Sequence, residues 1–173
     1  MGGKDVFKWG RKFLKKNLVR EVYMKKIESI MVPIDFSDTL NLLIEYAITF
    51  AKKFKAKLYV VHIVEDFSKY SSISVPHISM DNVMEEVYNY AKVQLKKLGD
   101  EKFEGKVKYE FMIEKGVAYK KILEFAEEKS ADLILIGTHG MSGLDKILFG
   151  STAERVVRGA KCPVIMINPH QPD

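Results

Sequence analysis

Glycine, serine and threonine are concentrated between residues 137 and 152, where the sequence reads GTHGMSGLDKILFGST. Glycine lets backbone N–H groups approach a ligand closely. Ser151 and Thr152 follow the last glycine and open a predicted helix, whose first turn offers unpaired N–H donors and the positive end of the helix dipole. These are the components of a phosphate-binding loop. A flexible loop followed by an ordinary Ser/Thr helix cap is the alternative interpretation.

The common phosphate and hydrolase motifs do not occur in this stretch. It contains no G-x-x-x-x-G-K-[ST], so it lacks the lysine of a P-loop, and no G-x-G-x-x-G, the usual dinucleotide fingerprint. The run from Gly140 to Gly143 is one residue short of the G-x-S-x-G turn that carries a nucleophilic serine. Its spacing is instead G-x2-G-x9-G-[ST], beginning at Gly137 and ending at Ser151.

A few residues elsewhere have side chains that suit a ligand site. Asp35 ends an apolar segment and is either an acceptor for a ligand hydroxyl or a turn residue before the next helix. His139 lies between two motif glycines, where it touches phosphate or only solvent, whereas His62 lies inside an apolar strand and is interpreted as a core histidine. The single cysteine, Cys162, excludes a cysteine zinc site within one chain, and no His/Asp/Glu cluster has metal-ligand spacing.

The elements that must position these residues alternate between strand and helix. Apolar segments predict strands, and apolar spacing of three and four residues predicts helices between them. The strands are expected at 27–35, 57–65, 106–116, 132–137 and 163–167, and the helices at 38–54, 81–98, 117–129 and 151–160. Helical crossovers favour a doubly wound, five-stranded parallel sheet with helices on both faces, which binds ligands beyond the carboxyl ends of its strands.

Some local features follow from the same patterns. Ser37 or Asp38 is expected to cap the first of these helices. The helix over 81–98 is expected to bury one apolar face, formed by Val83, Val87, Tyr90, Ala91 and Leu95. Residues 66–80 are rich in serine and have no clear period, so they are interpreted as a surface loop.

Composition and charge limit the classes of function. The chain has 173 residues, of which 47% are hydrophobic and 29% charged, an ordinary globular balance. The net charge of +5 is uneven, because residues 1–26 carry nine Lys/Arg and two acids, whereas the other 147 residues have a net charge of −2. The body is therefore no general polyanion binder, and nucleic acid is not an expected partner. No apolar run reaches about 18 residues and no signal-peptide core is present, so a cytoplasmic location is expected.

The basic N-terminal segment predicts an amphipathic helix over residues 4–25. Phe7, Leu14, Leu18 and Val22 recur near helical spacing, with Phe13 and Trp9 at the margins, and most of the basic residues fall outside that stripe. Three docking surfaces remain open: the protein's own domain or dimer, an anionic membrane to which it would bind peripherally, or a protein partner. Residues 1–26 are therefore assigned as a helical extension, separate from the domain expected over residues 27–173.

The motif and four segments in order resemble the ATP-binding members of the universal stress protein family. The segments are MVPIDFS, VVHI, ADLILIGTHG and GSTAERVVRGAKCPVIMI, and the similarity covers about 140 residues, from Ile27 to Ile167. The resemblance implies a Rossmann-like, adenine nucleotide alpha hydrolase-like fold that binds ATP, with Mg²⁺ arriving with the triphosphate. It also implies a homodimer that pairs strand 163–167 across a two-fold axis.

The same resemblance implies roles for individual residues. Asp35 would lie near the ribose and adenine, close to Pro33 in the same turn, and the backbone around Ile63 would meet the adenine. The residues expected around the ribose and phosphates are Gly137, His139, Gly140, Gly150, Ser151 and Thr152.

Three functions fit these expectations. The first is a regulatory module that holds ATP and signals a stress response through its conformation or partners. The second is a weak ATPase or autophosphorylating enzyme of the same fold, for which the sequence offers no convincing general base. The third is a nucleotide-free interaction scaffold.

Overall fold

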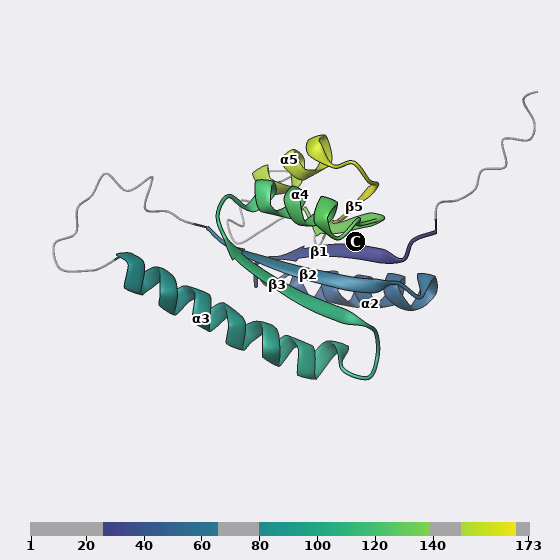
Figure 1. Cartoon of the computed structure of the whole chain (residues 1–173). Coiled ribbons are helices and arrows are strands. Elements are labelled where there is room, and N and C mark those ends of the chain that lie inside the picture. The colour runs from purple at the N-terminus through teal and green to yellow at the C-terminus, as the bar shows by residue number, and fades with distance from the viewer. Residues whose placement is uncertain (1–25, 66–79, 139–149, 169–173) are drawn as a thin grey trace, which may run out of the picture.

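A computed structural model describes residues 26–65, 80–138 and 150–168 of the chain. Its centre is a five-stranded parallel sheet with the strand order β3-β2-β1-β4-β5 (Figure 1). The strands are β1 Ser29–Ile34, β2 Lys57–Val64, β3 Tyr109–Lys115, β4 Leu133–Gly137 and β5 Val164–Ile167. The predicted doubly wound parallel sheet is therefore confirmed.

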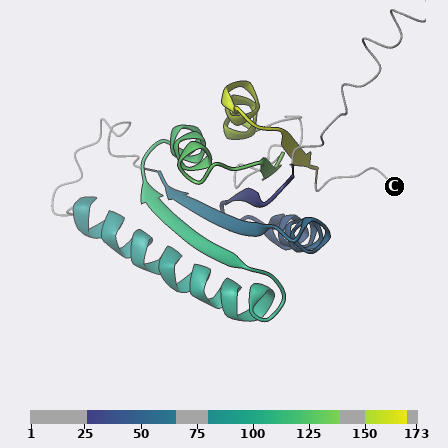
Figure 2. The ribbon, with the colours of Figure 1, turned by 45° about the vertical axis from the view of Figure 1, so that its right-hand side comes forward.

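Helices cover both faces of this sheet. The helices are α2 Leu40–Phe54, α3 Met80–Leu98, α4 Ala118–Glu128 and α5 Ser151–Gly159. Helices α2 and α3 lie on one face, and α4 and α5 lie on the other (Figures 1 and 2). This three-layer arrangement is the usual consequence of helical crossovers between parallel strands.

Alternate residues of the strands fill two hydrophobic cores. In β1, Ile30 and Val32 are fully buried against α2 and α3, whereas Met31, between them, is fully buried against α4 and α5. Because successive side chains of a strand point to opposite faces, a strand buried on both sides has an uninterrupted apolar sequence. That is why the strand segments are recognisable in the sequence.

The winding direction of the chain reverses at β1. From β1 the chain proceeds outward through β2 to β3, and it then returns to the other side of β1 to form β4 and β5. The connections after β1 and β4 therefore leave on opposite faces of the sheet, so the carboxyl ends of these neighbouring strands border a crevice. This edge of the sheet is the expected place for a ligand.

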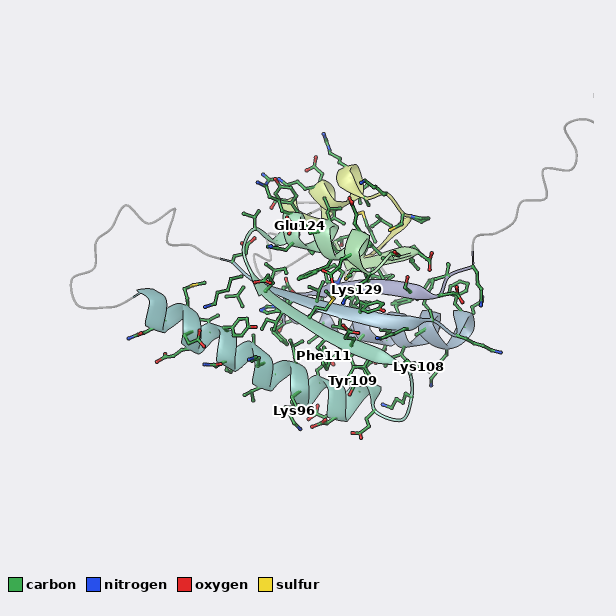
Figure 3. All side chains as sticks on the ribbon, in the orientation of Figure 1. Lys96, Lys108, Tyr109, Phe111, Glu124 and Lys129 are labelled. Atoms are coloured by element: carbon green, nitrogen blue, oxygen red, sulfur yellow. The ribbon has the colours of Figure 1, made fainter. Side chains whose placement is uncertain are left out.

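An aromatic cluster closes the core at the carboxyl end of α3. The helix continues into a π-helical turn, Gly99–Phe103, which buries the Phe103 ring completely. The ring centroids of Tyr109 and Phe111 in β3 lie 5.2 and 6.0 Å from that of Phe103, and Figure 3 shows both side chains beside α3. Aromatic pairs at such distances stabilise a core beyond their buried area.

The predicted side-chain cap of α2 is wrong. The helix begins after Thr39, and no side chain caps its N–H groups. Ser37 and Thr39 are engaged with each other, with 2.9 Å between their hydroxyl oxygens, and Leu40 N–H donates to the Ser37 carbonyl at 2.9 Å. A backbone turn thus replaces the cap that the sequence predicts at Ser37 or Asp38.

The predicted buried face of α3 is only partly correct. Ala91 and Leu95 are buried as expected, but Val83, Val87 and Tyr90 are exposed by 39%, 43% and 63%. Figures 1 and 2 show that the amino-terminal half of α3 reaches past the carboxyl ends of β2 and β3. The 19-residue helix is longer than the strands that it covers, so its first turns have no sheet surface to pack against.

Two predictions lie outside the described residues. These are the amphipathic helix over 4–25 and, apart from its last residue, the surface loop over 66–80. Among the residues that the structure describes, no helix is long and apolar enough to cross a membrane.

Candidate functional site

A tight turn places Asp35 directly beyond the carboxyl end of β1. The Ser37 N–H donates to Asp35 Oδ1 at 3.1 Å, which holds the carboxylate against its own backbone. Between them, the backbone of Phe36 has a φ of 59°, in the left-handed region that residues other than glycine rarely adopt. Such backbone strain persists only where surrounding contacts hold it in place.

The ring of His62 supplies those contacts from the neighbouring strand. The Phe36 and His62 ring centroids lie 4.6 Å apart, and His62 Nδ1 lies 3.0 Å from the Ile34 carbonyl oxygen. Because a carbonyl only accepts hydrogen bonds, Nδ1 is the donor in this contact. Burial lowers the pKa of His62 below 6.5, although the Ile34 carbonyl and Asp35 oppose that shift. His62 therefore ties the turn after β1 to β2 from a half-buried position, rather than from within the core as the sequence predicts.

A second tight contact joins the end of β4 to the beginning of α5. The Gly150 N–H donates to the Thr138 carbonyl at 2.7 Å, and the Thr138 N–H donates to the Ile167 carbonyl of β5 at 2.9 Å. A Cβ atom on Gly150 would lie only 3.3 Å from the same Thr138 oxygen. Gly150 has an ordinary φ of −64°, so close approach rather than an unusual backbone angle favours glycine here.

The amino end of α5 presents N–H groups without an intrahelical partner beside the end of β4. Gly150 is the cap residue, and no side chain of the described residues caps the helix. Like the first N–H groups of any α-helix, those of Ser151, Thr152 and Ala153 have no partner inside the helix. Glu154 in the first turn is paired with Arg158 at 2.8 Å. The positive end of the helix dipole and these donors can bind an anion.

The described residues that the sequence predicts for the site lie around the same edge of the sheet. Pro33 is buried in β1, and Ile63 is half-buried in β2 against the core beneath α4 and α5. Gly137 ends β4, next to the contact that positions Gly150, Ser151 and Thr152. His139 and Gly140 lie outside the described residues.

Two further residues, Thr138 and Phe36, contribute to this edge and were not predicted from the sequence. Thr138 is 3% exposed and anchors both β5 and the start of α5 through its backbone. Phe36 holds the turn after β1 by stacking on His62. The position of Thr138, directly after a glycine that ends a strand, could have indicated its role. The stacking of Phe36 on His62 depends on a neighbouring strand, which the sequence does not reveal.

The described residues of this edge combine groups that suit an anion with groups that suit a hydroxyl. In the described parts of the chain, no group of three His, Cys, Asp or Glu side chains is arranged to hold a metal ion. The features that the structure places together are a carboxylate after β1, a close backbone contact after β4 and the uncapped start of α5. A ligand with both hydroxyl and phosphate groups has complementary chemistry.

Comparisons with known proteins identify the fold and the family. The model of the universal stress protein family matches residues 26–168. Universal stress protein MJ0531 of Methanocaldococcus jannaschii is 37% identical over 140 residues, which cover 81% of each chain.

Two solved structures share the fold. The MJ0577 protein of M. jannaschii has a TM-score of 0.72 at 20% identity, and the match covers 85% of this chain and 99% of that chain. A universal stress protein from Archaeoglobus fulgidus, solved in complex with dAMP, has a TM-score of 0.52 at 24% identity, and the match covers 82% and 98%. From the family match and the 37% identical relative, we conclude that the chain belongs to the universal stress protein family.

Proposed function

We propose that the protein binds ATP across the carboxyl ends of β1 and β4 and acts as a nucleotide-dependent regulatory module in a stress response. The observation that carries this proposal is the uncapped start of α5, held against the end of β4 by the 2.7 Å bond from Gly150 to Thr138. Free N–H donors at a helix start suit the terminal phosphates of a nucleotide. The dAMP bound by the A. fulgidus relative supports an adenine nucleotide as the ligand class.

The proposed roles follow from where each residue lies. The backbone and hydroxyl groups of Ser151 and Thr152 would donate to phosphate, and the Asp35 carboxylate would accept from the ribose. Pro33 and Ile63 would contact the adenine, because strand alternation puts both side chains on the face that α4 and α5 cover. Gly137, Gly140, His139 and Gly150 would complete the loop around the phosphates. Mg²⁺ would arrive with the triphosphate and keep most of its waters.

The proposal assigns binding rather than catalysis. Phosphoryl transfer needs a positioned nucleophile and charge neutralisation in the transition state, and we assign neither role to a residue. ATP would act by favouring one conformation of the loops around it, which requires a higher affinity for that conformation. A cytoplasmic location belongs to this proposal, because ATP is the proposed ligand.

We extend the proposal to a homodimer formed through β5. This strand lies at the edge of the sheet, and all four of its residues, Val164–Ile167, are only half-buried within one chain. The Pro163 carbonyl accepts from Ile134 of β4, and the Ile167 carbonyl accepts from Thr138 directly after β4. By alternation, the backbone groups of Val164 and Met166 point to the open edge. An apolar edge strand with unpaired backbone groups favours pairing with another strand.

The phosphate position is tested by replacing Ser151 with aspartate. An acidic residue in the first turn stabilises a helix, so the Ser151→Asp variant should fold, while its carboxylate repels and displaces phosphate from the same N–H groups. We expect titration calorimetry to show at least about a tenfold loss of ATP affinity, equivalent to about 1.4 kcal/mol.

The control adds the same charge at another helix. Val117 precedes α4, has an extended backbone and is 42% exposed, so the Val117→Asp variant should bind ATP as the wild type does. Wild-type affinity in a folded Ser151→Asp variant would refute the proposed position of the phosphates.

A further inference from the structure

The amino-terminal half of α3 carries an apolar surface that no described element covers. Val83, Val87, Tyr90 and Val93 are exposed by 39%, 43%, 63% and 63%, and their spacing of three and four residues puts them along one side of the helix. We call these four residues the α3 apolar flank. They are four of the seven large hydrophobic residues that are exposed in the described parts of the chain.

The flank is distinct from the side of α3 that faces the sheet edge. Ala91, Leu95 and Leu98 form the buried line of the helix. On one side of that line, Lys92 and Lys96 border a cavity of about 250 Å³ with Tyr109 and Phe111 of edge strand β3. Val83, Val87 and Tyr90 lie on the other side of the buried line, so they face away from the β3 edge and toward the part of the sheet that α2 covers. Val93, two residues from both Ala91 and Leu95, points away from the sheet.

The chain begins β1 on the same face of the sheet. Ile27 packs against the core that α2 and α3 cover. The Lys57 N–H donates to the Glu28 carbonyl at 2.9 Å, next to the end of α2. The residues before Lys26 are therefore attached at the amino end of the sheet, on the α2 and α3 side. Both helices run from the carboxyl edge down to this end.

The preceding 25 residues have the length and the pattern to cover the flank. Phe7, Leu14, Leu18 and Val22 form the apolar stripe of the predicted helix, and from Phe7 to Val22 it would span about 23 Å. The flank from Val83 to Val93 spans only about 15 Å by the same rise of 1.5 Å per residue. A short amphipathic helix is marginal in water unless its apolar face is packed.

Charge also favours a contact between the N-terminal segment and the α3 apolar flank. Residues 1–26 have a net charge of +7, whereas the remaining residues have a net charge of −2. Glu86 is exposed on the same side of α3 as the flank, between Val83 and Tyr90. An acidic side chain at this place suits a helix whose polar face carries lysine and arginine.

We propose that residues 4–25 dock as an amphipathic helix on the α3 apolar flank of their own chain. Phe7, Leu14, Leu18 and Val22 pack toward Val83, Val87 and Tyr90, and the basic residues stay at the solvent side. This contact buries the α3 apolar flank, which the sheet does not cover. The inference does not depend on nucleotide binding.

Thiol reactivity in the full-length protein tests the contact. Cys162 is the only cysteine, so a Cys162→Ser background allows one new thiol to be followed with a maleimide. Val87→Cys is compared with Val117→Cys, because the two valines are 43% and 42% exposed in the described structure. We expect Val87→Cys to react at least about tenfold more slowly, equivalent to about 1.4 kcal/mol of docking free energy.

The occupant is identified by further substitutions in the same full-length chain. Leu14→Gln with Leu18→Gln should raise the Val87→Cys rate to that of Val117→Cys. Lys12→Gln with Lys16→Gln, outside the apolar stripe, should leave it slow. The slow rate should not change when the protein is diluted, and circular dichroism should confirm that each variant is folded.

Three results would overturn the proposal. Equal rates for Val87→Cys and Val117→Cys would show that the flank is uncovered. A slow rate that survives the Leu14 and Leu18 substitutions would assign the cover to another segment or molecule. A slow rate that is lost on dilution would assign it to a second copy of the chain.

Discussion

Two residues at the carboxyl edge of the sheet have backbone requirements that differ in kind. Gly150 adopts ordinary backbone angles but leaves no room for a side chain, because a Cβ atom would lie 3.3 Å from the Thr138 oxygen. Phe36 is strained at a φ of 59° and is held by the His62 ring. The motif spacing predicted the glycine, whereas the strained Phe36 had no signal in the sequence, since it depends on packing against β2.

His62 should make the stability of the fold depend on pH. Burial lowers its pKa in the folded protein, so the unfolded chain binds the proton first as the pH falls. The contribution of His62 is complete above its ordinary pKa of 6.5 and is lost progressively below it. Urea unfolding should show that the wild type loses more free energy of unfolding between about pH 7.5 and pH 5.5 than the His62→Gln variant. Equal losses in the two proteins would contradict this assignment.

Elements were predictable where their apolar pattern matched the surface beneath them. The central strands are buried on both faces, so their apolar runs gave their positions within a few residues. The apolar pattern of α3 correctly indicated a helix. It wrongly predicted that Val83, Val87 and Tyr90 are buried, because the sequence does not show that the strands beneath α3 end before its first turns. The start of α2 was also predicted incorrectly, since Ser37 bonds to Thr39 and Asp35 instead of capping the helix.

Gly99, in the turn that ends α3, should be sensitive to even the smallest side chain. A Cβ atom there would lie 2.8 Å from the Phe111 ring and 2.9 Å from the Tyr109 hydroxyl. Both rings pack on the fully buried Phe103, so an added methyl group would have to displace them from that contact. Gly99→Ala should therefore cost about 1–3 kcal/mol and lower the Tm by about 2–4 °C for each kcal/mol.

Differential scanning calorimetry would measure this effect. Lys97→Ala, two residues earlier on the exposed side of α3, is the matched control and should change the Tm little. An unchanged or raised Tm for Gly99→Ala would show that the aromatic cluster accommodates the added methyl group.

At the scale of the whole molecule, alternation of strands and helices predicted the doubly wound sheet, and the structure places β5 at its edge. The sequence could not show that the backbone of Thr138 joins β5, β4 and the start of α5, because those contacts cross a loop. The proposed dimer and the proposed nucleotide site therefore share β4 and β5 as their support. A change at the β5 edge is close enough to affect both.

The proposed dimer should be disrupted by proline at Met166. The Met166 N–H points away from β4, so proline removes a hydrogen bond at the open edge without removing one from the sheet. The wild type should have twice the 19.8 kDa mass of one chain in light scattering, whereas Met166→Pro should have that mass once. A wild type that is monomeric at micromolar concentration, or a folded Met166→Pro dimer, would contradict pairing through β5.

The central claim, that this chain binds ATP at the edge between β1 and β4, is tested most directly by titrating the wild-type protein with ATP, AMP and adenosine. Because the start of α5 is proposed to bind phosphate, calorimetry should show one ATP per chain and affinities that decrease from ATP through AMP to adenosine. No binding of ATP at millimolar concentration would contradict the claim. Adenosine that binds as tightly as ATP would contradict the role of α5.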